Sequence, residues 1–155
     1  MTERTHVLTG PAAADHPAWR LMLLVWVVSF VATLGSLFFS EVMRLAPCVL
    51  CWYQRICMYP LVAVFAVGML YRDFGVARYG WPLVVGGLAV ASYHNLLYYH
   101  LIPESITPCT TGVSCTSRQI EWLGFITIPL LSLVAFTMIA AGLWRFHRAV
   151  RGPER

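Results

Sequence analysis

The sequence predicts an all-α integral membrane protein that folds as a four-helix bundle. Three observations predict this class: the composition, four long stretches without charge, and the positions of the arginines. Of the 155 residues, 59% are hydrophobic and 12% are charged, with a mean hydropathy of +0.68. An average soluble domain carries about 25% charged residues. A single domain of this length cannot bury so much apolar surface in a water-soluble core, so we expect lipid to cover part of it.

The first two expected helices come from charge-free stretches in the N-terminal half of the chain. Residues 21–40 provide 20 uncharged positions, about the number that crosses a hydrocarbon core. We expect this helix to be retained, because it is longer than the apolar part of a signal peptide and no Ala-x-Ala cleavage site follows it. Residues 56–71 provide 16 more, and this stretch reaches back to residue 50 if Arg55 lies inside it.

The other two expected helices lie in the C-terminal half. Residues 79–103 carry no charge over 25 positions apart from neutral histidines, and residues 122–144 carry none over 23. All four stretches are continuously apolar rather than alternating, which favours helices over the strands of a membrane barrel.

The arginines predict the orientation of these helices, since the chain contains no lysine. Eight of the eleven lie in the two tails or between the second and third helices: Arg4, Arg20, Arg72, Arg78, Arg145, Arg148, Arg151 and Arg155. Positive charge is enriched on the cytoplasmic side. We therefore expect a cytoplasmic tail of residues 1–20, a membrane domain of residues 21–145 and a basic cytoplasmic tail of residues 146–155. The net charge of +4 then reflects topology, and we expect no nucleic-acid partner.

Four of the five cysteines form two pairs in the loops expected on the outer face. Cys48 and Cys51 lie between the first two helices, and Cys109 and Cys115 lie between the last two. Disulfides persist outside the cytoplasm, so both pairs can be oxidised there. Cys57 falls inside the second helix, where the ordinary interpretation is a small buried apolar residue.

Cys48 and Cys51 form a CxxC motif at the predicted start of the second helix, directly after Pro47. Unpaired N–H groups and the helix dipole stabilise a thiolate at this place and lower the pKa of a cysteine. The thiolate is the species that exchanges with disulfides. Arg55 follows Cys51 by four residues, so we expect its cation on the same helical face, beside the polar Gln54.

A CxxC motif alone leaves several functions open. No histidine follows Cys51, so covalent haem attachment is not indicated, and four thiolates in an oxidising compartment would oxidise rather than hold zinc. One alternative is a membrane protein that binds or delivers Cu(I), which soft sulfur ligands select. Its candidate ligands are Cys48, Cys51, Cys57, Met43 and Met58. Another alternative is a structural membrane subunit whose disulfides only hold loops together, although the polar cluster of the CxxC with Gln54 and Arg55 argues against it.

Residues 47–55, PCVLCWYQR, resemble the signature of the DsbB family of disulfide-bond formation membrane proteins. The second pair adds to this resemblance. Five residues separate Cys109 from Cys115, and together with residues 120–129, IEWLGFITIP, this region is similar to the BdbC branch of the family. The resemblance covers roughly residues 20–145 and includes the four-helix layout. Members with a longer loop separate their second pair much further, so details of loop movement do not transfer to this chain.

The resemblance implies a thiol:quinone oxidoreductase in the bacterial cytoplasmic membrane. Such a protein reoxidises an extracytoplasmic, DsbA-like thiol oxidase of the thioredoxin fold and passes the electrons to the membrane quinone pool, as ubiquinone or menaquinone. An exposed loop pair would suit the protein partner, and a pair at the membrane boundary would suit a lipid-soluble acceptor.

The resemblance also implies roles for individual residues. The partner is expected to attack Cys109 and release Cys115. The loop pair then exchanges with Cys48 and Cys51, and Cys51 passes the electrons to the quinone. Arg55 and Gln54 are expected to bind that quinone. His94, an ionisable residue inside a membrane helix and therefore a functional candidate, is expected to approach its head group. No metal site is expected.

Overall fold

A computed structural model describes residues 17–102, 115 and 127–151 of the chain. Regular structure in these residues is helical throughout. Helix α1 spans Pro17–Leu37 and continues into the π-helical turn η2, Phe38–Val42. The other helices are α2, Val49–Leu70, α3, Val76–Tyr98, and α4, Ile128–Arg151.

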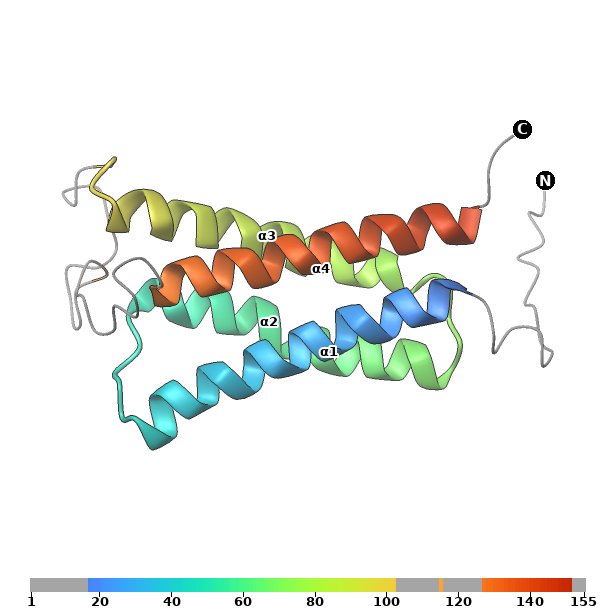
Figure 1. Ribbon diagram of the computed structural model, residues 1–155, viewed down its shortest axis with the longest axis horizontal. Coiled ribbons are helices and arrows are strands. Elements are labelled where there is room, and N and C mark those ends of the chain that lie inside the picture. Colours follow the sequence, from blue (N-terminus) through green and yellow to red (C-terminus); the bar gives the residue numbers. More distant parts are fainter. Residues whose placement is uncertain (1–16, 103–114, 116–126, 152–155) are drawn as a thin grey trace.

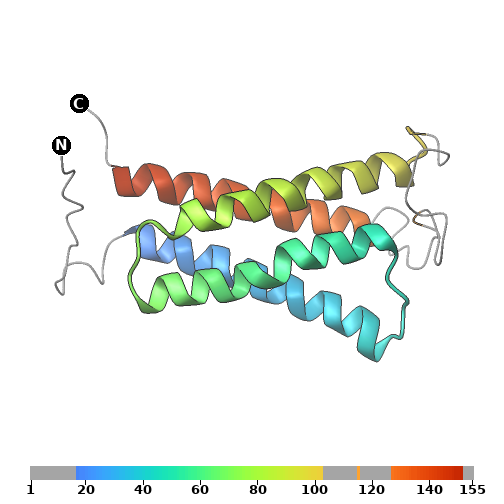
Figure 2. The same ribbon diagram turned by 180° about the vertical axis from the view of Figure 1, so that it is seen from behind.

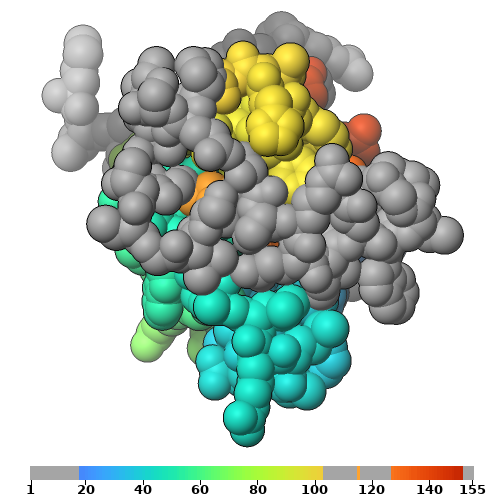
Figure 3. All heavy atoms as spheres, turned by 90° about the vertical axis from the view of Figure 1, so that its left-hand side faces the viewer, coloured from blue at the N-terminus to red at the C-terminus, as the bar shows by residue number. Residues whose placement is uncertain are grey.

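The four helices run up and down in sequence order and form an antiparallel bundle (Figures 1 and 2). Each helix packs against the next one in the chain, and α4 closes the bundle against α1. The described ends of α1 and α4 that lead to the two termini lie at one end of the bundle, together with the α2–α3 turn. The α1–α2 connection and the end of α3 lie at the opposite end, which Figure 3 shows in cyan and yellow.

Among the described residues, three segments are long and apolar enough to cross a membrane: Ala18–Val42, Val49–Leu70 and Ile128–Arg151. The 23-residue α3 is long enough but less apolar, because it begins three residues before the predicted stretch and so includes Arg78, and because it carries His94 and Asn95. Both of these polar side chains are buried inside the bundle. The all-helical prediction is confirmed, and the fourth span stays a prediction.

The inner faces of the helices build the main core with large side chains, among them Phe65, Phe136, Ile139 and Leu143. Gly87 of α3 lies against Phe136 of α4, and a Cβ atom at this position would overlap the ring of Phe136. Many large apolar side chains face outward instead, including Leu24, Val31, Ile56, Leu70 and Val134. An apolar exterior of this extent is what lipid-facing helices require.

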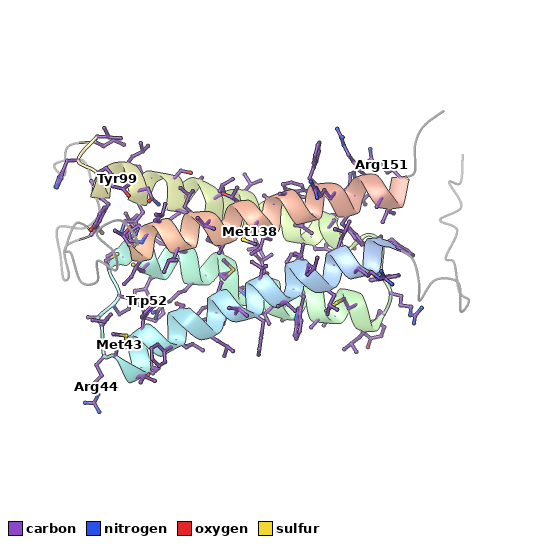
Figure 4. The ribbon with its side chains drawn as sticks, viewed as in Figure 1. Met43, Arg44, Trp52, Tyr99, Met138 and Arg151 are labelled. Atoms are coloured by element: carbon purple, nitrogen blue, oxygen red, sulfur yellow. The ribbon has the colours of Figure 1, made fainter. Side chains whose placement is uncertain are left out.

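Charge divides the two ends of the bundle. Six described arginines lie at the end with the termini: Arg20, Arg72, Arg78, Arg145, Arg148 and Arg151. In Figure 4, Arg151 marks the end with the termini, and Arg44 and Tyr99 mark the opposite end. A second small core, made of Cys48, Leu50, Leu97 and Cys115, lies near the start of α2. The cysteines therefore gather away from the arginine-rich end.

Candidate active site

Cys48 is the N-cap residue of α2. Its backbone is extended, and its Sγ accepts the N–H of Cys51 at 3.4 Å. The first N–H groups of a helix have no partner within the helix, so a side-chain acceptor at the cap satisfies one of them. The expectation of a CxxC motif at a helix start is thus confirmed, with the first cysteine as the cap.

Three groups that can donate a hydrogen bond surround the Cys48 sulfur. The thiol of Cys51 lies 2.9 Å from it, the N–H of Cys51 approaches it, and Nε2 of His94 lies 3.8 Å away. Cys48 precedes the candidate span that starts at Val49. The hydrogen bond from the Cys51 thiol, together with that from His94, lowers the pKa of Cys48 to about 4 despite the opposing effect of burial. These contacts therefore favour the thiolate form of Cys48 in the reduced pair.

His94 connects Cys48 to two further residues. Its Nδ1 lies 3.2 Å from Nε2 of Gln54, and its own Nε2 lies 3.2 Å from the backbone oxygen of Cys115. Only 2% of His94 and 7% of Gln54 is exposed. These contacts join α2, α3 and the segment that holds Cys115.

Cys115 is disulfide-bonded and only 4% exposed. The expectation of an exposed loop pair is wrong for Cys115, because this cysteine packs in the small core with Leu97, Leu50 and Cys48. Cys109 lies outside the described residues. Cys115 thus faces the interior of the bundle, in the same small core as Cys48.

A cavity of about 590 Å³ opens between α1, α2 and α4 beside the CxxC motif. Its wall is mainly apolar. The polar residues that line it are Ser36, Cys51, Gln54, Arg55, Tyr59 and Ser132. Pockets for small molecules and cofactors have volumes of about 300–1,000 Å³ and combine apolar walls with a few polar groups. Cys51 and Arg55 share this wall, as their spacing predicts, whereas neither Cys48 nor His94 is part of it.

Arg55 is held in place at the cavity wall by neutral groups. Its Nη2 donates to the backbone oxygen of Ser36 at 3.1 Å, and its guanidinium lies 5.4 Å from the ring centroid of Trp52. Tyr59, one helical turn further on, donates its hydroxyl to Oγ of Ser36 at 3.3 Å. Within the described residues no carboxylate pairs with Arg55. Its positive charge therefore remains available to a molecule in the cavity.

The structure thus gathers Cys48, Cys51, Gln54, Arg55 and His94 at one end of the bundle, with Cys115 beside them. Sequence reasoning missed two residues of this region. Tyr59 could have been found from its position four residues after Arg55, on the same helical face. Ser36 gave no signal, because its contribution is partly a backbone oxygen and its partner lies 19 residues away.

Cys48, Cys51 and His94 also place three possible metal ligands within 4.8 Å of one another. Cys57 is not part of this group, and its Sγ would lie 3.7 Å from a Cβ atom at Gly86 on α3. The Nε2 of His94 already faces the carbonyl of Cys115, which accepts a hydrogen bond and cannot donate one. Metal binding at Nε2 would require this contact to break.

The bundle has apolar spans. Cys48, at the N-cap of α2, has a lowered pKa and lies beside the disulfide-bonded Cys115. These features define the class as a membrane protein of thiol–disulfide exchange. The chain belongs to the DsbB family: it matches the family described as "Disulfide bond formation protein DsbB" over residues 18–145. It is therefore an oxidoreductase of disulfide-bond formation.

Several relatives support the same assignment. The chain is 49% identical over 123 residues to a "Probable disulfide formation protein" of Metapseudomonas resinovorans, which covers 79% of this chain and 85% of the relative. It is 45% identical over 116 residues to "Disulfide bond formation protein C" of Bacillus subtilis strain 168, and the match covers 74% of this chain and 83% of the relative. A "Probable disulfide formation protein C" of Bacillus cereus is 42% identical over 119 residues, with 77% and 86% covered. No solved structure matches the chain significantly.

Proposed function

We propose that this chain is a thiol:quinone oxidoreductase of the bacterial cytoplasmic membrane. It reoxidises an extracytoplasmic, DsbA-like thiol oxidase and passes the electrons to a membrane quinone, either ubiquinone or menaquinone. The termini lie in the cytoplasm, residues 21–145 form the membrane domain, and the cysteine pairs lie on the outer face. The end of the bundle that carries most of the described arginines supports this orientation.

One observation carries the proposal: the CxxC motif lies between a second redox-capable cysteine and an apolar cavity. On one side, His94 contacts both Cys48 and the backbone of Cys115. On the other side, Cys51 lines the cavity together with Arg55. The two cysteines of the motif thus face different neighbours, as a relay of electrons from a disulfide to a lipid-soluble acceptor requires.

The thiol–disulfide steps balance without another oxidant. The reduced partner attacks the loop disulfide at Cys109, and Cys115 leaves as a thiolate. Cys115 then attacks Cys48 of the oxidised motif, which forms a Cys48–Cys115 bond and releases Cys51 as a thiolate. After the partner has left with its own disulfide, Cys109 attacks Cys115, and Cys48 leaves as a thiolate. The loop pair is oxidised again, and the motif has taken up two electrons.

A quinone fits the cavity in size and chemistry. The volume of about 590 Å³ and the apolar wall suit a ring with an isoprenoid tail. A bound quinone supplies a two-electron acceptor. Arg55, held by Ser36, is placed to donate a hydrogen bond to a ring oxygen and to stabilise negative charge there. Cys51 presents its sulfur to the same space, and Gln54 adds a polar group to the wall.

The test is quinone-dependent oxidation of a reduced thioredoxin-fold protein by the purified chain in detergent. We expect one quinone to be consumed for every two partner thiols, because each disulfide formed releases two electrons. Cys51→Ser and Cys109→Ser should abolish turnover, because each removes one cysteine of the relay. Cys57→Ser is the matched control, since Cys57 belongs to neither pair, and it should retain activity.

The same experiment separates the proposal from its alternative, a Cu(I)-binding protein. Absence of quinone reduction with several partners and with both quinone types, combined with stoichiometric copper after purification, would replace the relay by metal binding. Equal activity of Cys51→Ser and the unaltered protein would also contradict the relay.

A further inference from the structure

His94 makes three polar contacts, and their chemistry determines where its proton lies. The backbone oxygen of Cys115 is an acceptor only, so Nε2 of His94, 3.2 Å away, must carry a hydrogen. The side-chain amide nitrogen of Gln54 is a donor only, so Nδ1 of His94, 3.2 Å away, must accept. Both contacts are satisfied together by the neutral imidazole with its hydrogen on Nε2.

In this tautomer the Nε2–H group also faces the sulfur of Cys48. The distance of 3.8 Å fits a hydrogen bond to sulfur, and the other donors at this sulfur come from Cys51. His94 therefore donates toward Cys48 and cannot accept its proton at Nε2. Gln54 contacts neither cysteine pair through any hydrogen bond described, so it acts through the imidazole.

We propose that Gln54 is a positioning residue that holds His94 as the Nε2–H tautomer, and that this N–H group holds the Cys48 thiolate and the Cys115 backbone together for exchange between the two cysteine pairs. This inference rests on the relay proposed above and assigns His94 to its thiol side rather than to the cavity. The position of His94 outside the cavity wall supports that assignment.

The hydrogen bond from His94 assists most in the step in which Cys48 leaves Cys115 as a thiolate. When Cys109 attacks Cys115, an S–S bond forms between these two and the Cys48–Cys115 bond breaks. The electron pair of the broken bond stays on Cys48, whose negative charge then accepts the hydrogen bond of His94. A thiolate that is stabilised in this way leaves faster. The contact to the Cys115 carbonyl holds the central residue of the exchange beside the leaving sulfur.

Two measurements on the full-length protein in detergent test the inference. The first follows the alkylation rate of Cys48 against pH in a Cys51→Ala, Cys57→Ala background with the loop disulfide intact. The second follows the Cys48–Cys115 disulfide in a glutathione redox buffer, in a Cys51→Ala, Cys57→Ala, Cys109→Ala background. In both backgrounds, the protein with native His94 and Gln54 is compared with the variants His94→Leu, His94→Gln and Gln54→Met.

We expect His94→Leu and Gln54→Met to raise the pKa of Cys48 by about one unit, because a hydrogen bond to a charged group is lost or misdirected. The equilibrium constant for forming the Cys48–Cys115 disulfide should rise about tenfold, because the lost hydrogen bond stabilises the reduced thiolate and one pKa unit is a factor of ten. His94→Gln keeps a side-chain N–H and should restore most of both values. Asn95→Leu is the control: it removes the amide hydrogen bonds to Ala91 and Pro129, so it should lower the melting temperature and leave both values unchanged.

The outcomes separate this inference from the relay itself. If Cys48 and Cys115 form no disulfide while His94 and Gln54 are intact, the relay is wrong. If the disulfide forms with the same equilibrium constant in every variant and the pKa of Cys48 does not change, the relay stands and the role of Gln54 and His94 is wrong. Should His94→Leu fail to fold, Gln54→Met decides the matter, since it keeps the length of the side chain.

Discussion

The sulfur of Cys48 has polar contacts with its own helix and with a neighbouring one, and both lower the pKa of this cysteine. The Cys51 contacts follow from the CxxC spacing at a helix start, which places both donors one turn from the cap. The His94 contact comes from α3 and crosses 46 residues of sequence. A local motif thus supplies a reactive thiolate, and the bundle directs it toward Cys115.

The lowered pKa of Cys48 predicts how the stability of the reduced protein depends on pH. The folded-state pKa of about 4 lies below the ordinary value of 9.0, so the folded protein releases this proton more readily than the unfolded chain. The resulting stabilisation is complete above pH 9 and is lost as the pH falls toward 4. We expect the melting temperature to fall more between pH 8 and pH 4.5 for the reduced protein than for Cys48→Ala. Equal slopes in the two proteins would contradict a thiolate at Cys48.

Arg55 is expected to act only on the quinone side of the relay. Replacing it by Met removes the cation from the cavity wall and should reduce quinone-dependent turnover roughly 100-fold, the effect of losing one preorganised donor. Exchange between the two cysteine pairs, measured without quinone, should continue at its original rate. Arg55→Lys keeps the charge but loses the planar guanidinium and should lie between the two. An equal loss in both assays would show that Arg55 instead supports the bundle.

At the scale of the helices, close packing depends on a few positions where α3 has no side chain. The adjacent glycines Gly86 and Gly87 differ in this respect. Gly87 faces the ring of Phe136 on α4, whereas a Cβ atom at Gly86 would make an ordinary contact of 3.7 Å with the sulfur of Cys57. Small residues at helix interfaces let backbones approach closely in membrane bundles.

This difference predicts unequal effects of the same substitution. Gly87→Ala should destabilise the folded protein by about 1–3 kcal/mol, because Phe136 is fully buried and has little room to move. Gly86→Ala should be neutral or slightly stabilising, since alanine is the better helix former. Thermal unfolding of both variants in the same detergent measures the difference. Equal melting temperatures would mean that α3 and α4 can separate at this point without loss.

The ends of α2 and α3 are closed by residues with positive φ that are not glycine. Arg72 has φ 52° and His100 has φ 56°, a left-handed conformation that glycine adopts without strain. His100→Gly should therefore stabilise the protein by about 1 kcal/mol. The neighbouring Tyr99 has φ −84°, so Tyr99→Gly should bring no gain and serves as the control. Unfolding in detergent measures both, and a lower melting temperature for His100→Gly would show that its side chain matters more than its backbone.

At the scale of the whole molecule, the arginines separate the two ends of the bundle. The α2–α3 turn carries Arg72, the start of α3 carries Arg78, and the end of α4 carries three more described arginines. The end with the cysteines carries the polar contacts of the site, among them those of His94 and Arg55. If positive charge marks the cytoplasmic side, the cysteine pairs face outward, where disulfides persist.

Labelling of single cysteines tests this orientation. In a background without native cysteines, Leu101→Cys should react with a membrane-impermeant maleimide in intact spheroplasts. Tyr71→Cys should react only after the membrane is opened. Both positions are well exposed, at 70% and 80%, so accessibility within the protein does not distinguish them. The reverse pattern of labelling would place the relay on the cytoplasmic face.

The sequence by itself determined the all-helical class of fold and indicated most of the residues that we propose to react. Apolar stretches of membrane length specify helices because lipid provides no partner for backbone groups. The CxxC motif after Pro47 specifies a thiolate at a helix start, because unpaired N–H groups are present at every helix N-terminus. These are local properties, readable within one helix.

Only the tertiary structure decided what lies next to each cysteine. The contacts of His94 with Gln54 and with Cys115 span 40 and 21 residues, and that of Arg55 with Ser36 spans 19. Their formation depends on how each helix is rotated and how closely it packs, which positions such as Gly87 control from a distance in sequence. For the same reason the sequence placed Cys115 on an exposed loop, whereas packing against Leu97 buries it beside Cys48. Helical periodicity indicates which residues share a face, but the partner of that face is chosen by the packing of the whole bundle.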